Sequence, residues 1–245
     1  MGVAGAPNAA FESYVDSARP PRKPPWIRSG VPSGGAVHEL RAMLDGLDLH
    51  TVCESARCPN LAECWSHRTA TLMLLGDVCT RSRGFCSVKT GRPPSVDTDE
   101  PERVAEAAER MGLRHVVLTS VNRDDLPDGG ASVFAEAIHA TRNRLPDCTI
   151  EVLVPDFQGN WDALQRVANA APDILNHNVE TAPRLYPRVR PQAKYERSLE
   201  ALRRSSDAGM VTKSGFMVGL GEERDEITAL LSDLRANRVN IVTVG

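Results

Sequence analysis

The chain has 245 residues, enough for one large α/β domain or two small ones with a sizeable core, and its 41% hydrophobic and 25% charged residues are ordinary globular values. A formal net charge of -3, with no stretch that concentrates Lys and Arg, argues against nucleic acid as a partner. No run of 18 apolar residues is present and the N-terminus lacks the apolar core of a secretory signal, so we expect no transmembrane helix, no membrane partner and a cytoplasmic location.

Residues 1–35 are rich in Pro, Gly, Ala and Arg, and this composition predicts a flexible, extended arm. The acidic residues Glu12 and Asp16 are untypical of a transit peptide, which is poor in acids. Residues 36–69 are expected to form an N-terminal extension. This extension begins with a helix predicted at 37–47 and carries the first three cysteines of the chain.

From residue 70 onward, short β-branched runs alternate with segments of helical period, which is typical of βα units with parallel strands. Six strands are predicted, at residues 71–77, 115–120, 150–155, 174–180, 212–219 and 239–244. Helices are predicted at residues 101–111, 131–144, 161–170, 195–208 and 223–236. Gly112 stands where a left-handed cap would end the first of these helices. The pattern favours an α/β fold, a partial (β/α)6 TIM-like barrel over residues 70–245.

Polar residues gather directly after the predicted strands. They occupy residues 119–130, 154–156, 176–181 and 219–222. In βα barrels the C-terminal ends of the strands meet at one face, and function lies there. The sequence therefore predicts a binding site at this face of the barrel.

Five of the six cysteines are crowded into one part of the chain, namely Cys53, Cys58, Cys64, Cys79 and Cys86. A disulfide framework suits small secreted domains with little core. Zinc prefers paired Cys-x2-Cys knuckles, which are absent here, although His67 would be available to complete a site. Wider spacing on loops suits an iron–sulfur cluster. The spacing alone leaves these three explanations open.

The segment Cys53-Glu-Ser-Ala-Arg-Cys58-Pro-Asn-Leu-Ala-Glu-Cys64 resembles the auxiliary-cluster signature of lipoyl synthases, a family of radical S-adenosylmethionine (SAM) enzymes. Residues 76–93, with Cys79 and Cys86, are similar to the stretch that holds the radical-SAM cluster of that family. The resemblance spans residue 24 to the end and continues through residues 119–130, 151–157, 176–181, 184–191 and 212–215.

The resemblance implies a barrel of the radical-SAM type and an enzyme that inserts two sulfur atoms at C6 and C8 of a protein-bound octanoyl group, which gives lipoyl. It implies SAM, a radical-SAM 4Fe–4S cluster on Cys79 and Cys86, and an auxiliary 4Fe–4S cluster on Cys53, Cys58 and Cys64. The partners implied are octanoylated lipoyl carrier domains, from a 2-oxoacid dehydrogenase E2 or a glycine cleavage H protein. An electron donor such as a ferredoxin or flavodoxin is implied as well.

The resemblance also implies a SAM pocket at the strand ends and no catalytic residue beyond the cluster ligands. The expected cofactor-binding residues are Thr119, Ser120, Asp124, Gly129, Gly130, Asn176, Asn178, Glu180 and Lys213. The two glycines would allow close backbone approach. The residues alone do not distinguish a cofactor contact from an ordinary surface position. Asp124 could equally be a solvated loop residue, and Lys213 could equally be a surface charge.

The sequence departs from the family at the radical-SAM pattern Cys-x3-Cys-x2-Cys. Cys79 and Cys86 stand at its first and third positions, but Arg83 stands at the second. Arginine has no lone pair to offer iron and stays protonated in proteins. Ser82 offers only a poor oxygen ligand, so we expect this cluster site to be empty or labile.

A second departure concerns the end of the sequence. Lipoyl synthases continue to a serine-bearing motif whose serine is the fourth ligand of the auxiliary cluster, whereas this sequence ends at Gly245, so a barrel truncated at its C-terminus is expected. Both departures favour an alternative function, a relative that binds a cluster or the octanoylated carrier without turnover. An iron–sulfur electron carrier would leave the polar strand ends without a role. Cys148 has no family counterpart and is expected to be a plain thiol.

Overall fold

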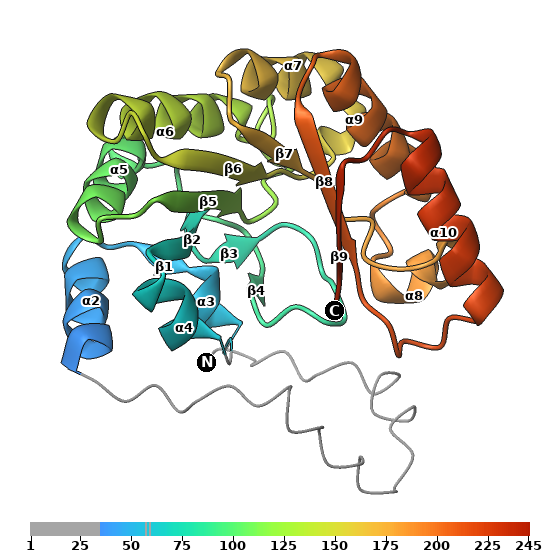
Figure 1. The fold of residues 1–245 in the computed structure, drawn as a ribbon, viewed down its shortest axis with the longest axis horizontal. Helices are drawn as coiled ribbons and strands as arrows, with labels where there is room; N and C mark the ends of the chain where they lie inside the picture. Colours follow the sequence, from blue (N-terminus) through green and yellow to red (C-terminus); the bar gives the residue numbers. More distant parts are fainter. Residues whose placement is uncertain (1–34, 57, 59) are drawn as a thin grey trace, which may run out of the picture.

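A computed structural model describes residues 35–56, 58 and 60–245 (Figure 1). The predicted arm, residues 1–35, lies outside the described residues except for Gly35. None of the described helices combines the length and the hydropathy that a membrane span requires.

A sheet of seven strands forms the centre of the fold (Figure 1). Six of these strands are parallel and pair in chain order: β2 (Thr69–Leu74), β5 (His115–Ser120), β6 (Thr149–Leu153), β7 (Ile174–Asn176), β8 (Val211–Phe216) and β9 (Ile241–Val244). The seventh, β1 (His50–Thr51), pairs antiparallel with β2 at the edge opposite β9. Among the described residues β1 and β9 do not pair with each other, so the barrel is partial, as predicted.

Helices connect the parallel strands and cover the outer face of the curved sheet (Figure 1). They are α5 (Glu100–Arg110), α6 (Ala131–Arg144), α7 (Trp161–Asn169), α9 (Tyr195–Asp207) and α10 (Arg224–Ala236), while α2 (Gly35–Gly46) precedes β1. Their ends have local causes. The Asn160 side chain accepts a hydrogen bond from the backbone of Ala163 at the start of α7, and Gly112, with φ of 59°, forms the predicted left-handed turn after α5.

Several short elements surround the strand ends and were not predicted. They are α3 (Val52–Ser55), α4 (Leu61–Ser66), β3 (Val78–Cys79), β4 (Lys89–Thr90), η2 (Phe157–Gly159), η3 (Pro183–Leu185) and α8 (Tyr186–Val189). The sequence does not reveal them because two to six residues are too few to show a periodic pattern.

Four predicted strands end earlier than expected, and those predicted at 150–155 and 212–219 end at Leu153 and Phe216. The strand predicted at 71–77 ends at Leu74, because Leu75 and Gly76 adopt positive φ angles of 68° and 80°. The strand predicted at 174–180 ends at Asn176. As a consequence, the polar residues that follow these strands lie in loops above the sheet.

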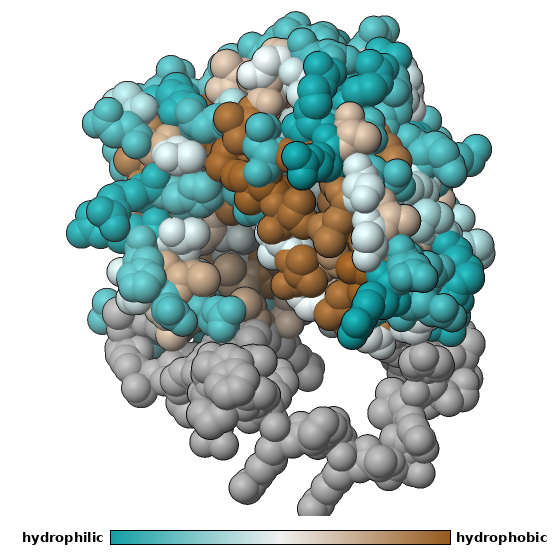
Figure 2. Space-filling view, turned by 45° about the vertical axis from the view of Figure 1, so that its right-hand side comes forward, coloured by the Kyte–Doolittle hydropathy of each residue, from teal (hydrophilic) through white to brown (hydrophobic). Residues whose placement is uncertain are grey.

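The side of the barrel that carries β9 exposes apolar side chains. Ile241, Val242 and Val244 of this last strand are 38%, 38% and 54% exposed. Figure 2, in which the side with β8, β9 and α10 comes forward, shows a hydrophobic area there. The main core lies elsewhere, where residues such as Leu118 and Phe134 bury the sheet against the helices.

Candidate functional site

A buried carboxylate shapes the loop that leads to Cys79. Glu100, at the start of α5, accepts hydrogen bonds from the backbone N–H groups of Leu75 (2.7 Å) and Gly76 (3.3 Å). Burial raises the pKa of Glu100, and these two hydrogen bonds oppose that effect. The turn runs into β3, which pairs with β4, and Cys79 at the end of β3 is only 1% exposed.

The sulfur of Cys79 is surrounded by hydrogen-bond donors. It accepts backbone N–H groups from Arg81 at 3.4 Å and from Asn122 at 3.3 Å. Hydrogen bonds to the ligating sulfurs are among the features by which a protein tunes an iron–sulfur cluster. Cys79 therefore has the surroundings that a cluster ligand needs.

Arg83 and Cys86 lie on the loop between β3 and β4, and both line a cavity above the sheet. The backbone N–H of Cys86 donates to the carbonyl of Arg83 at 3.1 Å, which closes a turn. The guanidinium carbon of Arg83 lies 6.0 Å from the ring centre of Phe85, and its Nε is buried without a hydrogen-bond partner. Between its two cysteines this loop thus presents a cation instead of a third thiol.

The cavity has a volume of about 150 Å³ and lies at the C-terminal ends of β5, β6 and β7, the face on which βα barrels carry their sites. Four of the predicted cofactor residues line it, namely Thr119, Ser120, Asn178 and Glu180. Val52 of α3 also lines it, which brings the helix of Cys53 next to the cavity.

Glu180 has a strained backbone beside this cavity. Its φ of 65° lies in the left-handed region, which costs a non-glycine residue about 1–2 kcal/mol. Its N–H donates to the carbonyl of Gly215 and its carbonyl accepts from Met217, each at 2.9 Å, so β8 holds it in place. Burial raises the pKa of its carboxyl, and the charges of Arg190 and Arg83 oppose this. Strain of this kind is typical of binding residues.

An ion network forms another part of the cavity wall. Arg81 donates to Asp124 through Nε (2.6 Å) and a terminal nitrogen (2.8 Å), and pairs with Asp156 at 2.8 Å. Arg197 of α9 reaches the second oxygen of Asp156 at 3.1 Å. Burial raises the pKa of Asp156, but the charges of Arg81 and Arg197 hold it below its ordinary value.

Replacing Asp156 by alanine is expected to destabilise the protein by about 3–5 kcal/mol, because two arginines then lose a buried partner. Urea unfolding at neutral pH measures this loss. Glu102→Ala is the control, since it removes an ion pair with Arg144 that lies at the surface, and it should leave the unfolding midpoint nearly unchanged. Equal midpoints for Asp156→Ala and wild type would contradict the structural role of the network.

His177 is a buried neutral group at the cavity, 2% exposed. Its Nδ1 lies 2.8 Å from the carbonyl oxygen of Val154 and its Nε2 lies 3.0 Å from Oγ of Ser198. Burial lowers its pKa from 6.5 to about 4. The neutral ring satisfies both contacts, with Nδ1–H donating to the carbonyl and Nε2 accepting from the hydroxyl.

This burial makes stability depend on pH. The unfolded chain protonates His177 below about pH 6.5, whereas the folded protein does so only near pH 4, so stability should fall as the pH drops through this window. The loss attributable to His177 reaches roughly 3 kcal/mol at the lower end. Urea unfolding at several pH values measures it. His177→Gln should flatten the dependence, while His139→Gln, at an exposed position of α6, should retain it, and the reverse pattern would contradict the assignment.

Cys53, Cys58 and Cys64 are brought together by two short helices. Cys53 lies in α3, Cys64 lies in α4, and the N–H of Cys58 donates to the carbonyl of Cys53 at 2.9 Å. Burial, followed by the influence of Cys53 and Cys58, raises the pKa of Cys64. All six cysteines of the chain are free, so the disulfide framework is not formed. Three neighbouring free thiols are a donor set that fits a 4Fe–4S cluster.

No three His, Cys, Asp or Glu side chains in residues 35–56, 58 and 60–245 are close enough to share a single metal ion.

Cys148 directly precedes β6, apart from the other cysteines in the sequence, and it is buried. Burial raises the pKa of its thiol.

Two further predicted residues contact a buried carboxylate inside the barrel. Nδ2 of Asn176 donates to Glu151 at 2.9 Å, and Nζ of Lys213 donates to Glu151 at 3.0 Å. Glu151 is 2% exposed and also faces His115 at 3.4 Å. Lys213 is therefore half-buried and paired, not a surface charge, and its contact with the cofactor stays a prediction.

The remaining predicted residues, Gly129 and Gly130, lie at the start of α6 with φ of 60° and 91°. A Cβ at Gly130 would lie 2.3 Å from Cδ1 of Leu75, and one at Gly129 would lie 3.0 Å from the Phe157 ring. The close approach that they allow in this structure is to protein side chains.

Three residues of the site were not singled out from the sequence: Arg81, Asp156 and Arg190. Each had a signal, because Arg81 stands between the two cysteines of the radical-SAM stretch, Asp156 directly follows a strand, and Arg190 belongs to the segment 184–191. Arg190 is 7% exposed and donates to the carbonyl of Asn178 at 2.7 Å, which ties it to the cavity wall.

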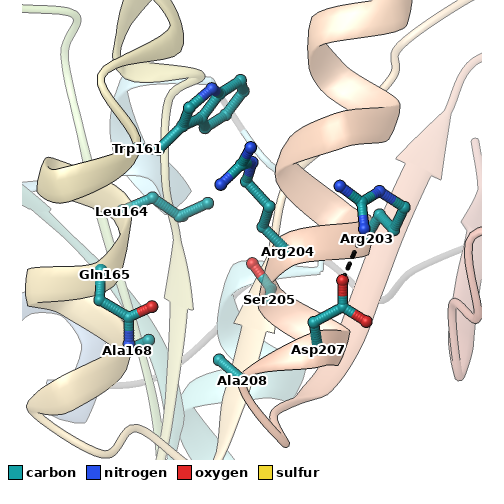
Figure 3. Close-up of a pocket in the computed structure, with 9 residues that line it drawn as sticks. All are labelled: Trp161, Leu164, Gln165, Ala168, Arg203, Arg204, Ser205, Asp207 and Ala208. Carbon is teal, nitrogen blue, oxygen red and sulfur yellow. Dashed lines mark hydrogen bonds and ion pairs between the residues drawn. The ribbon is translucent and has the colours of Figure 1, made fainter.

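A second cavity, of about 440 Å³, lies on the outer surface between α7 and α9 (Figure 3). Its charges are already paired. The guanidinium carbon of Arg204 lies 4.9 Å from the Trp161 ring centre, and Arg203 pairs with Asp207 at 2.7 Å. It contains no cysteine and lies far from the strand ends, so the candidate site is the cavity above the sheet.

Comparison with known proteins defines the class. Residues 73–234 match the family model of the radical SAM superfamily. The crystal structure of methylornithine synthase (PylB) superposes with a TM-score of 0.58 at 16% identity and covers 85% of this chain and 63% of that chain. HydG, a hydrogenase maturase, gives a TM-score of 0.57 at 16% identity, with 84% and 47% covered. The protein therefore has the radical-SAM fold.

Residues 11–58 match the model of the N-terminal domain of lipoyl synthase. The lipoyl synthase of Rubrobacter xylanophilus is 60% identical over 225 residues, which are 91% of this chain and 70% of that protein. Those of Symbiobacterium thermophilum and Chloroflexus aggregans are 56% and 52% identical, with 91% and 92% of this chain and 71% and 74% of those proteins covered. The chain belongs to the lipoyl synthase family.

Membership confirms the predicted family and implies its cofactors, namely SAM, a radical-SAM 4Fe–4S cluster and an auxiliary 4Fe–4S cluster. The two cluster sites fit these groups unequally. Cys53, Cys58 and Cys64 offer three neighbouring thiols. The radical-SAM stretch offers two thiols and a guanidinium, which does not fit a cluster held by three thiolates.

Proposed function

We propose that this protein serves the lipoyl synthase reaction, the insertion of two sulfur atoms at C6 and C8 of a carrier-bound octanoyl group. The observation that supports it is the 60% identity with the lipoyl synthase of Rubrobacter xylanophilus over 91% of the chain. Octanoylated domains of a 2-oxoacid dehydrogenase E2 or of a glycine cleavage H protein are the proposed substrates. A ferredoxin or flavodoxin is the proposed electron donor, and the cytoplasm is the proposed location.

The proposed division of labour follows the two cysteine groups. Residues 36–69 would hold an auxiliary cluster, which when bound supplies sulfur, and residues 70–245 would form the barrel that binds SAM and the octanoyl chain. Val52 lines the cavity and directly precedes Cys53, so a chain that enters the cavity also approaches the auxiliary cysteines. Thr119, Ser120, Asn178 and Glu180 are the proposed cofactor contacts, and a substrate bound over the cavity would help to shield a reactive carbon from water.

A second function, binding of the octanoylated carrier without turnover, is favoured by one observation. Arg83 occupies the second ligand position of the radical-SAM motif and presents a cation to the cavity. The comparisons support the enzyme instead, because the relatives that match over most of the chain are lipoyl synthases.

One experiment separates the two functions. The protein is purified and reconstituted anaerobically with iron and sulfide, then incubated with an octanoylated lipoyl domain, SAM and dithionite. Mass spectrometry of the domain reads out the gain of two sulfur atoms. Sulfur insertion supports the enzyme. An unchanged domain that nevertheless comigrates with the protein in gel filtration supports the second function and overturns the first.

A further inference from the structure

The cavity contains buried polar atoms that no protein group satisfies. Within the described part of the chain, Nε of Arg83, Nε of Arg190 and Oγ of Ser120 are buried and have no hydrogen-bond partner. All three residues line the same cavity. Because buried polar groups in folded proteins are nearly always hydrogen-bonded, three such atoms around one cavity indicate a polar ligand.

The charges of the cavity wall indicate which charged groups that ligand carries. Arg81 and Arg197 together balance the charges of Asp124 and Asp156, with N–O distances of 2.6 to 3.1 Å. The other two guanidinium groups, those of Arg83 and Arg190, act on a single carboxylate, that of Glu180. These three groups are two cations and one anion, so the cavity can pair both with a ligand carboxylate and with a ligand ammonium.

The size of the cavity limits the part of a ligand that it encloses. Its volume of about 150 Å³ is below the roughly 300–1,000 Å³ of pockets that enclose whole small molecules. A head group fits such a space. An α-amino acid head group carries a carboxylate, which the planar fork of a guanidinium binds in two places, and an ammonium, which pairs with a carboxylate. Arg83 and Glu180 are these two partners. Arg83 lies on the β3–β4 loop and Glu180 lies in the segment after β7, and both line the cavity.

We propose that Arg83 and Glu180 bind the zwitterionic head group of an α-amino acid, and that this chain holds the methionyl end of SAM through this pair without iron. The inference rests on the proposed function for the identity of the ligand and deepens it. It gives Arg83, at the replaced ligand position, a role. The Arg83 guanidinium would bind the carboxylate of SAM and the Glu180 carboxylate would bind its amine, the two groups that an open iron would otherwise bind. Ser120 and Arg190 add further donors to the same carboxylate.

Isothermal titration of the metal-free, reduced protein tests the proposal. Three probes share the adenosine part: SAM, S-adenosylhomocysteine, and 5'-methylthioadenosine, which lacks the amino acid end. We expect the first two to bind about 10- to 100-fold more tightly than the third, the range that charge-assisted hydrogen bonds provide. Equal affinities, or no binding of any probe, would overturn the proposal. This comparison uses the wild-type protein and depends on no variant.

Variants then assign the preference to the two residues. Arg83→Ala and Glu180→Gln should each abolish most of the preference for the amino acid end, and Arg83→Lys should keep part of it. Arg204→Ala, which removes a guanidinium stacked on Trp161 outside the cavity, should change nothing. A full preference in Arg83→Ala would overturn the assignment. Because no turnover is measured, a failure here leaves the lipoyl synthase reaction untouched, and a failed sulfur insertion leaves this binding untouched.

Discussion

Arg83→Cys is expected to raise the iron content of the anaerobically reconstituted protein from about four to about eight atoms per chain, the difference of one 4Fe–4S cluster. The physical reason is local. Cys79 and Cys86 already stand at the first and third positions of the motif, and Cys79 has two N–H donors on its sulfur. The substitution exchanges a cation without a lone pair for a thiolate at the missing position.

Two measurements check this expectation. Colorimetric iron counting gives the number of atoms, and EPR of the dithionite-reduced protein with and without SAM shows whether the new cluster has an iron open to the cofactor. Arg83→Cys should show a spectral change on addition of SAM, and wild type should show none. The sulfur insertion assay should then respond in the same direction, with more lipoyl formed by the variant.

Ser82→Cys is the matched control. It adds the same thiol to the same loop, one residue away from the motif position, at a side chain that is exposed. It should leave iron near the wild-type value, because the spacing to Cys79 and Cys86 is then wrong. An equal rise in both variants, or no rise in Arg83→Cys, would contradict the explanation that Arg83 alone excludes the cluster.

The barrel could be predicted from the sequence because its strands are short β-branched runs, each followed by a helix with a clear period. β5 and α6 have the predicted bounds. The end of β2 could not be predicted, because the turn at Leu75 depends on Glu100, 25 residues later in the chain. Lys213 shows the same limit, since its partner Glu151 is 62 residues away and no local pattern links the two.

The residues of the candidate site that follow strands could be predicted from the sequence, and the others could not. Thr119, Ser120, Asn178 and Glu180 follow strands, and the topology of a parallel barrel brings strand ends together whatever the side chains are. Arg190 reaches the cavity from the end of α8, a helix of four residues that follows no strand, and so escaped that rule. The cysteines stood out by their crowding, and the resemblance to lipoyl synthases divided them into two cluster sites. Which of these sites fits a cluster depended on one residue, Arg83, between Cys79 and Cys86.

The difference between the two cysteine sites predicts a second large effect, on which of the two sites binds iron in the wild-type protein. Cys64→Ala is expected to reduce iron from about four atoms to nearly none, while Cys86→Ala is expected to leave it near four, because only the auxiliary site has three thiols. Cys148→Ala, which removes a buried thiol apart from both groups, should match wild type. Iron counting after desalting measures all three.

In the Arg83→Cys background the same two substitutions should behave alike, each halving the iron content from about eight to about four atoms. The comparison between backgrounds matters because a variant that merely misfolds would lose iron in both, whereas Cys86→Ala should lose iron only when the third thiol is present to complete its site. Iron loss from Cys86→Ala in the wild-type background would show that two thiolates suffice to hold a cluster beside Arg83. The Arg83 guanidinium would then lie next to a bound cluster and would not exclude it.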